Sequence, residues 1–272
     1  MKTDYHLHTE FSDDSTYPIE QLVQDAIDMG LEEICITDHV DYGIKYDRED
    51  PDRPEDAVLN VDYPRYFEQL ETLKNKYKEQ ITIRKGLEFG IQTHTIGQFE
   101  KLYGTWPLDF VLLSIHQVDN KEFWNQDYQK EKSQEEYNIG YYNELLALVR
   151  TFKHYSVLAH MDMIVRYDPN GTYPFEKVKP IIEKILKQVI ADGKGIEVNT
   201  SSFQYRLNDL TPSRDILSLY KELGGTIITI GSDAHQHNYV ANQIEAVKQE
   251  LKEMGFEHFY TFDRMQPIPH RL

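Results

Sequence analysis

Histidines and acidic residues recur in this chain directly after short apolar runs. The pentapeptide Gly231-Ser232-Asp233-Ala234-His235 follows residues 226–230, a β-branched run that is typical of a buried strand. An acid and an imidazole therefore stand just beyond the C-terminal end of a predicted strand. Gly, Ser and Asp are also turn-forming residues, so the pentapeptide taken alone fits an ordinary turn about as well.

The same arrangement is repeated along the chain, and the repetition decides between the two interpretations. Six of the 11 histidines and two acids stand at or just after the end of a predicted strand. These eight residues are His6, His8, His39, Glu88, His116, His160, Asp233 and His235. Any one of them fits a hydrogen-bonded residue at a strand end. Eight at equivalent places indicate a shared site instead.

The donor types of these residues indicate a metal centre. Imidazole and carboxylate ligands without thiolate suit borderline divalent ions such as Zn²⁺, Mn²⁺ or Fe²⁺. Eight donors exceed the four ligands of one tetrahedral ion, so we expect at least two metals with a carboxylate such as Glu88 between them. His6 and His8 are two residues apart, so they project from the same side of an extended chain.

Seven apolar runs alternate with segments of helical periodicity, which predicts a parallel sheet covered by helices. The predicted strands are residues 2–5, 33–37, 81–88, 109–115, 156–159, 195–200 and 226–230. We predict an α/β fold, a distorted (βα)7 TIM-like barrel in one domain over residues 1–272. In such a barrel the C-terminal ends of all strands lie on one face, where the metal site would form. An open doubly wound sheet is the alternative, because periodicity does not reveal closure.

Composition limits the classes of partner. The chain has 46 acidic and 29 basic residues and a net charge of −17, which argues against nucleic acid or an anionic membrane. A small phosphorylated substrate stays compatible, because bound metal ions reverse the local field. There is no apolar run of membrane-spanning length and no signal-peptide pattern at the N-terminus, so we expect a cytoplasmic protein.

Two arginines suit a phosphorylated substrate. Metal clusters that activate water for attack on phosphorus require further cations to hold the phosphate. Arg166 lies in the loop after the fifth predicted strand, and Arg206 lies in the loop after the sixth. The planar guanidinium matches phosphate oxygens, so we expect both arginines to bind phosphate. Each taken alone also fits a solvated surface residue.

The ordered motifs of the chain resemble those of the PHP (polymerase and histidinol phosphatase) superfamily. The motifs are His6-Leu7-His8, Thr37-Asp38-His39, Gly86-Leu87-Glu88-Phe89-Gly90, Ser114-Ile115-His116, Ala159-His160 and Gly231-Ser232-Asp233-Ala234-His235. The resemblance extends from residue 1 to about residue 240. Chain length, the Gly-Leu-Glu segment and the two arginines make the chain most similar to the histidinol-phosphatase branch.

The resemblance implies the same barrel with two or three metals and assigns the ligands to three sets. The first set is His6, His8, Glu88 and Asp233. The second set is Glu88, His116 and His160. The third set is His39 and His235, with Asp14 where some members carry a histidine. Asp13 is adjacent, so Asp14 is a preference between neighbours. Arg166 and Arg206 fall where the phosphate-contacting arginines of the family are expected.

The implied activity is hydrolysis of L-histidinol phosphate to L-histidinol and phosphate, a step of histidine biosynthesis, through a hydroxide held between metals. The expected catalytic residues are Glu88, Asp233 and His235, and His235 is a candidate acid for the leaving alkoxide. Residues 41–62 form a long loop, which either encloses a cationic amino-imidazole group or is a solvated flap. A phosphatase for phosphotyrosine protein or nucleotides, an exonuclease and a non-catalytic metal-binding protein are the alternatives. A homodimer is one expectation for assembly.

Overall fold

The computed structural model describes residues 1–272, and its strands form a nearly closed barrel. Seven parallel strands pair in the order β1-β2-β4-β5-β8-β9-β10, and β3 pairs with the end of β4. The strands of the barrel are β1 (Thr3–Asp4), β2 (Glu33–Ile36), β3 (His39–Val40), β4 (Thr82–Gly90), β5 (Phe110–Ser114), β8 (Val157–Leu158), β9 (Gly195–Asn199) and β10 (Ile228–Gly231). The seven predicted strands are therefore all present.

Hydrogen bonds join the last strand to the first, which favours a barrel over an open sheet. The Tyr5 backbone N–H donates to the Ile230 carbonyl at 3.2 Å, and the His8 N–H donates to the Ala234 carbonyl at 3.0 Å. The N–H of Asp233 returns a bond of 2.8 Å to the His6 carbonyl. These bonds extend the pairing beyond β1 and β10. They bring the histidine-bearing segments 6–8 and 233–235 together.

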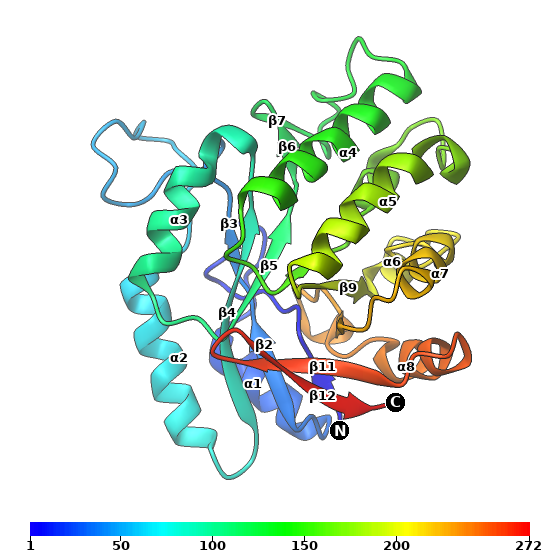
Figure 1. Cartoon of the computed structure of the whole chain (residues 1–272). Helices are drawn as coiled ribbons and strands as arrows, with labels where there is room; N and C mark the ends of the chain where they lie inside the picture. Colours follow the sequence, from blue (N-terminus) through cyan, green and yellow to red (C-terminus); the bar gives the residue numbers. More distant parts are fainter.

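Helices surround the barrel, as Figure 1 shows. They are α1 (Ile19–Asp28), α2 (Tyr63–Tyr77), α3 (Ile96–Thr105), α4 (Gln134–Thr151), α5 (Phe175–Ala191), α6 (Ser201–Gln204), α7 (Arg214–Glu222) and α8 (Ile244–Glu253), with short 3₁₀ turns η1 (Thr93–Thr95), η2 (Met163–Tyr167) and η3 (His237–Tyr239). A capping box begins α4, because Ser133 accepts a bond from the Glu136 N–H and the Glu136 carboxylate accepts one from the Ser133 N–H. No helix combines the length and apolarity that crossing a bilayer requires.

Strand alternation separates the two sides of the barrel wall. Leu87 and Phe89 of β4 join a core of 67 buried residues between strands and helices. Glu88, between them, faces the interior, because successive strand residues point to opposite faces. In β9 the same phase turns Ile196 and Val198 outward and Glu197 inward. The interior of the barrel is therefore apolar near its N-terminal end and acidic near its C-terminal end.

A hairpin absent from the sequence-based prediction covers the N-terminal end of the barrel. β11 (His258–Asp263) and β12 (Gln266–Arg271) pair antiparallel, drawn in red in Figure 1. Phe262 packs inside the barrel with Tyr5 and Phe110. His258 and His270 lie in this hairpin, away from the other end of the barrel. Two prolines in β12 hid the strand, since proline removes a donor and is tolerated on an edge.

Two polar segments outside the barrel have little regular structure. A small hairpin of β6 (Gln117–Val118) and β7 (Lys121–Glu122) follows β5. The predicted loop over residues 41–62 has only isolated bridges, between Tyr42 and Lys45 and between Tyr46 and Leu59. Both segments belong to the C-terminal end of the barrel, where the predicted site residues gather.

Candidate metal centre

Glu88 is the central carboxylate of the site. It lies at the end of β4 and is fully buried. Its Oε1 lies 2.9 Å from His160 Nε2 and 3.1 Å from His116 Nε2. Its Oε2 lies 3.1 Å from both His6 Nε2 and His39 Nδ1. Each oxygen of Glu88 thus faces a different set of imidazoles, which is the arrangement that a carboxylate bridging two cations needs.

The His6-Leu7-His8 segment follows β1 and presents two imidazoles to the same acid. Leu7 turns into the core, while both histidines are fully buried in the barrel. Asp233 Oδ1 lies 3.6 Å from His6 Nε2 and 3.3 Å from His8 Nε2. Asp233 has a φ of 56°, a left-handed conformation that is rare for a residue with a side chain. The turn after β10 holds this conformation and aims the carboxylate at the two histidines.

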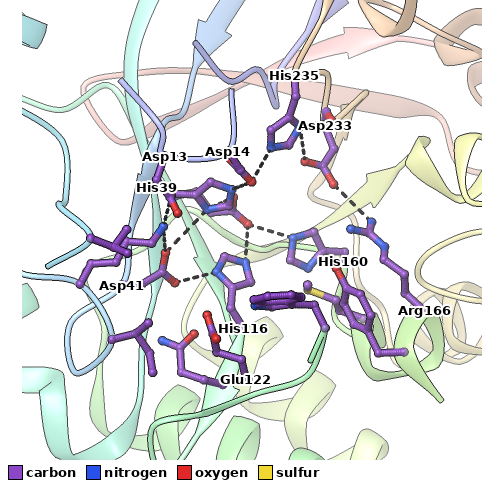
Figure 2. Close-up of a pocket in the computed structure, with 18 of the residues that line it drawn as sticks. Asp13, Asp14, His39, Asp41, His116, Glu122, His160, Arg166, Asp233 and His235 are labelled. Carbon is purple, nitrogen blue, oxygen red and sulfur yellow. Dashed lines mark hydrogen bonds and ion pairs between the residues drawn. The ribbon is translucent and has the colours of Figure 1, made fainter. Parts of the chain in front are cut away.

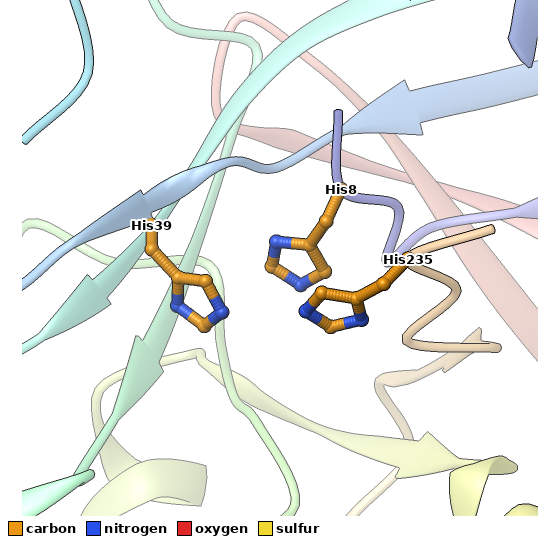
Figure 3. A group of neighbouring side chains, drawn as sticks. All are labelled: His8, His39 and His235. Atoms are coloured by element: carbon orange, nitrogen blue, oxygen red, sulfur yellow. The ribbon is translucent and has the colours of Figure 1, made fainter. Parts of the chain in front are cut away.

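A third group of side chains lies nearer the mouth of the site. Asp14 Oδ2 is 3.1 Å from His235 Nε2 and 3.5 Å from His39 Nε2. The His8 ring stacks against both other imidazoles, with centroids 4.2 Å from His39 and 4.1 Å from His235 (Figure 3). The neighbouring Asp13 pairs with Lys45 instead. The geometry therefore brings Asp14, rather than Asp13, to the two outer histidines.

Burial and neighbouring charges set the protonation of this cluster. Burial alone would raise the pKa of Glu88, but His6, His39 and His116 hold it well below its ordinary value. Burial lowers the pKa of His8 well below the ordinary imidazole value, and His235 and His39 lower it further. His8 is thus neutral at pH 7, which is the state that a metal ligand requires.

Buried acids orient the imidazoles, and the sequence analysis did not assign them this role. Glu197 Oε1 accepts a bond of 2.6 Å from His6 Nδ1, and Glu197 Oε2 accepts one of 2.9 Å from the backbone N–H of His160, which holds the strand end rather than the ring. Asp41 Oδ1 lies 2.7 Å from His116 Nδ1. Partners of this kind fix which ring nitrogen is free to bind a metal. A single acid within an otherwise apolar strand was the available signal for Glu197.

The start of the 41–62 loop is part of the site. Asp41 is buried, and its Oδ2 accepts a bond of 2.8 Å from Lys45 Nζ. Lys45, Ile44 and Val58 line the same cavity as the histidines. Asp47, in contrast, accepts bonds from the hydroxyls of Tyr42 and Tyr63, which tie the loop to α2. The loop thus contributes side chains to the wall of the cavity.

Arg166 lies on the opposite side of the cavity, as Figure 2 shows. Its guanidinium donates to Ser201 Oγ at 2.6 Å and to Asp233 Oδ2 at 3.3 Å, and lies 4.0 Å over the Tyr205 ring. Its Nε is buried and has no hydrogen-bond partner. The side chain is therefore held rigidly in the wall of the cavity.

The structure does not bring Arg206 into this cavity. Its side chain is exposed and lines a second hollow instead, and its φ of 53° is left-handed. Its predicted contact with phosphate stays a prediction. The five histidines outside the cluster do not line the cavity either. They are His94, His154, His237, His258 and His270.

The cavity has a volume of about 580 Å³, and its donors fit divalent metal ions. The nitrogens His8 Nε2 and His39 Nδ1 and the ring nitrogen His160 Nδ1 are buried without a hydrogen-bond partner. Orphaned buried nitrogens of this kind are rare unless something else satisfies them. Four groups of three donors have their ligand atoms within 4.8 Å of one another: His8, His39 and His235; His6, Glu88 and His160; His6, His8 and Asp233; and His39, Asp41 and His116. Divalent cations would satisfy the nitrogens that face these carboxylates.

Comparison with known proteins agrees with this geometry. The model of the PHP domain family matches residues 4–201. A histidinol-phosphatase of Lactococcus lactis is 32% identical over 273 residues, covering 97% of this chain and 96% of the relative. The chain belongs to the PHP histidinol-phosphatase family. A second member, a probable histidinol-phosphatase of Thermotoga maritima, is 31% identical and covers 94% of this chain and 93% of the relative.

Solved structures of the PHP histidinol-phosphatase family share the fold. The crystal structure of histidinol phosphate phosphatase from Lactococcus lactis, complexed with zinc, L-histidinol and phosphate, matches with a TM-score of 0.87 and 30% identity over 98% of both chains. A putative histidinol phosphatase from Listeria monocytogenes matches with a TM-score of 0.75 over 90% of this chain and 99% of the other, at 21% identity, which shows the shared fold. The predicted family and barrel are confirmed.

Proposed function

We propose that this chain is a metal-dependent phosphomonoesterase that hydrolyses L-histidinol phosphate to L-histidinol and phosphate. The observation that carries the proposal is the position of Glu88, whose two oxygens face different imidazoles beside the buried Arg166. The Lactococcus lactis relative, which has zinc, L-histidinol and phosphate in its crystal structure, supports the same substrate. The family relationship covers nearly the whole chain.

We propose two or three divalent ions, with zinc as the first candidate because the Lactococcus lactis structure contains it. Manganese and iron are alternatives for these nitrogen and oxygen donors. The proposed ligand sets are His6, His8, Glu88 and Asp233; Glu88, His116 and His160; and His39, His235 and Asp14. Ions bound there would polarise phosphoryl oxygens and lower the pKa of water to supply a nucleophile.

The proposed roles of the protein groups follow from their contacts. Arg166 would hold the equatorial phosphate oxygens through its guanidinium, which Tyr205 and Ser201 already fix at the cavity wall. Glu88 and Asp233 would separate the cations and keep their spacing. Glu88 is fully buried, so no bulk water would reach a bound phosphate from the side on which Glu88 lies.

The proton for the leaving alkoxide is proposed to come from His235. Its ring is 27% exposed at the mouth, with Nδ1 within 2.9 Å of the Asp233 carbonyl and Nε2 beside Asp14. His235 cannot bind a metal through Nε2 and donate a proton from Nε2 at the same time. His235→Ala therefore separates the two roles: lost metal indicates a ligand, and a lower kcat with full metal content indicates the acid.

The substrate assignment is tested by phosphate release from protein with assayed metal content. L-histidinol phosphate is compared with phosphotyrosine and a nucleoside monophosphate. We expect kcat/KM for L-histidinol phosphate to exceed the others by at least about a hundredfold, since its amino-imidazole group contributes binding energy. A preference for another phosphoester would reject the substrate and keep the phosphatase. No hydrolysis of any ester by the fully metal-loaded protein would reject both.

The role of Arg166 has a separate test. Arg166→Lys keeps the charge and removes the planar fork, so kcat/KM should fall about tenfold to a hundredfold with metal content unchanged. Arg206→Ala is the companion variant. An unchanged kcat/KM would remove Arg206 from phosphate binding, in agreement with its exposed position. The predicted homodimer and the organisation as one domain stay predictions.

A further inference from the structure

A second cavity lies on the other side of the wall that carries Arg166. Its volume is about 350 Å³, and it is enclosed by α4, α5, α7 and the segments 162–175 and 206–213. No residue lines both cavities. Tyr142, Tyr173 and Phe175 give it aromatic walls, and Val178 of α5 adds an aliphatic one. A volume of this size accommodates a small organic molecule.

Two polar side chains in the wall of this cavity lack partners. Asp162 is 5% exposed, and its Oδ2 accepts a bond of 2.8 Å from the Ser213 N–H. The other oxygen, Asp162 Oδ1, is buried with no hydrogen-bond partner. Tyr173 is 8% exposed, and its hydroxyl is likewise unpartnered. Unsatisfied buried groups are costly, so a ligand with a hydrogen-bond donor for Asp162 and a polar atom for Tyr173 would stabilise both.

The charges around the cavity narrow the ligand class. Asp209 pairs with Arg214 and Asp215 is exposed, which leaves Asp162 as the buried acid without an ion pair; burial raises its pKa to about 7, and a cationic group beside it would favour the ionised form. Arg206 lines the same cavity and makes neither an ion pair nor a side-chain hydrogen bond. A cavity that offers a carboxylate, a guanidinium and aromatic walls suits a zwitterion with a ring.

We propose that the second cavity binds a free amino acid with a ring-bearing side chain. Its ammonium group donates to Asp162 Oδ1, its carboxylate pairs with Arg206, a polar atom of the ligand bonds to the Tyr173 hydroxyl, and its ring packs between Tyr142 and Phe175. The binding site is separate from the metal centre. The two cavities share the turn η2, from which Met163 and Arg166 line the metal cavity and Ile164 and Val165 line the second.

Calorimetric titration of the metal-loaded protein tests the ligand class. The probes are L-phenylalanine, L-tyrosine and L-histidine, with phenethylamine lacking the carboxylate and 3-phenylpropionate lacking the ammonium group. We expect at least one amino acid to bind, and each half-ligand to bind about tenfold more weakly, because each loses a charge-assisted hydrogen bond. No binding of the three amino acids at about 10 mM would overturn the proposal.

The location of binding needs its own control. Saturating inorganic phosphate, a probe of the metal cavity, should leave the amino-acid affinity unchanged. Metal-free protein should also bind with the same affinity, so this result does not depend on the proposed phosphatase function. Displacement by phosphate, or loss of binding with the metals, would place the amino acid in the metal cavity and overturn the proposal.

Three variants give the residue-level test. Asp162→Asn keeps an acceptor for the Ser213 N–H but loses the charge, so it should weaken binding about tenfold or more. Tyr173→Phe should weaken it about threefold. Tyr155→Phe is the matched control, because Tyr155 is another buried tyrosine with an unpartnered hydroxyl, outside the cavity. Equal losses in the two tyrosine variants, or full affinity in Asp162→Asn, would contradict the proposal. If Asp162→Asn does not fold, the affinities of Tyr173→Phe and Tyr155→Phe decide whether the proposal holds.

Discussion

Glu197 Oε1 lies 2.6 Å from His6 Nδ1, and both side chains are fully buried. The bond fixes the His6 ring so that its Nε2 faces Glu88 and Asp233. The second oxygen of Glu197 accepts a bond from the backbone N–H of His160, so one carboxylate contacts two predicted ligands from different strands. A residue that touches no proposed metal thus orients the His6 ring and holds the backbone that carries His160.

Replacement of Glu197 should therefore weaken metal binding. In Glu197→Gln the amide keeps the size of the side chain but loses the charge, and we expect a loss of metal affinity of about tenfold to a hundredfold. Competition with a chelating dye measures it. Glu33→Gln is the control, a buried glutamate on β2 that pairs with Arg84 away from the site. Glu33→Gln should lower thermal stability and retain metal; unchanged affinity in Glu197→Gln would contradict the orienting role.

Gly90 gives a steric prediction. A Cβ at this position would overlap the Asp41 carboxylate and come within 2.8 Å of His116 Nδ1. Gly90→Ala should separate Asp41 from His116 and reduce the occupancy of the metal held by His116, measured by elemental analysis. Gly104→Ala in α3 is the control, since its Cβ meets nothing within 4 Å and alanine favours a helix. Full metal occupancy with normal activity in Gly90→Ala would contradict this prediction, because Asp41 would then have moved without loss of the metal held by His116.

Asp14 and Asp13 form a matched pair of neighbours. Asp14 reaches His39 and His235, whereas Asp13 pairs with Lys45. Asp14→Asn should weaken the binding of the ion of the third ligand set, because an amide oxygen is a poorer ligand than a carboxylate. Asp13→Asn should keep all of its metal. The comparison uses metal-to-protein ratios after gel filtration, and equal ratios in the two variants would remove Asp14 from the third ligand set.

Metal binding should depend on pH in a defined direction. Burial alone would lower the pKa of His116 and His235, but Asp41 and Glu88 raise the pKa of His116 to about 10, and Asp14 and Asp233 raise that of His235 to about 9. Both rings hold protons at pH 7 in the metal-free protein, and a metal must displace them. Apparent affinity should thus rise about tenfold per pH unit for each proton released, below about pH 9.

The same two histidines predict the stability of the metal-free protein. Their folded pKa values lie above the unfolded value, so they stabilise the fold fully below about pH 6.5, and that stability is lost as pH rises towards about 10. Thermal melts of metal-free protein should therefore show a falling Tm between about pH 7 and pH 10. Metal-loaded protein, in which neutral imidazoles are ligands, should lack this slope. A flat profile for both forms would contradict the raised pKa values.

The sequence by itself determined the barrel and most of the cluster. Apolar runs mark strands, and a residue at the end of a parallel strand in a barrel must lie on one face, so His6, Glu88, His116 and His160 were predictable together. The position of a residue relative to an apolar run is local information. It also assigned Asp233 and His235 to the C-terminal face of the barrel. The same local signal did not reveal closure between β1 and β10, because closure depends on hydrogen bonds between the two ends of the chain.

The tertiary structure decided the contacts that depend on side-chain direction and on loops. It brought Asp14 rather than Asp13 to His235, and it joined Asp41, at the start of the 41–62 loop, to His116. It also placed Arg206 at a different cavity from Arg166, although both arginines lie in loops that follow a strand. Loop residues have no fixed period, so their direction follows from long-range packing. Residues on the strands have a period of two, and their direction was already in the sequence.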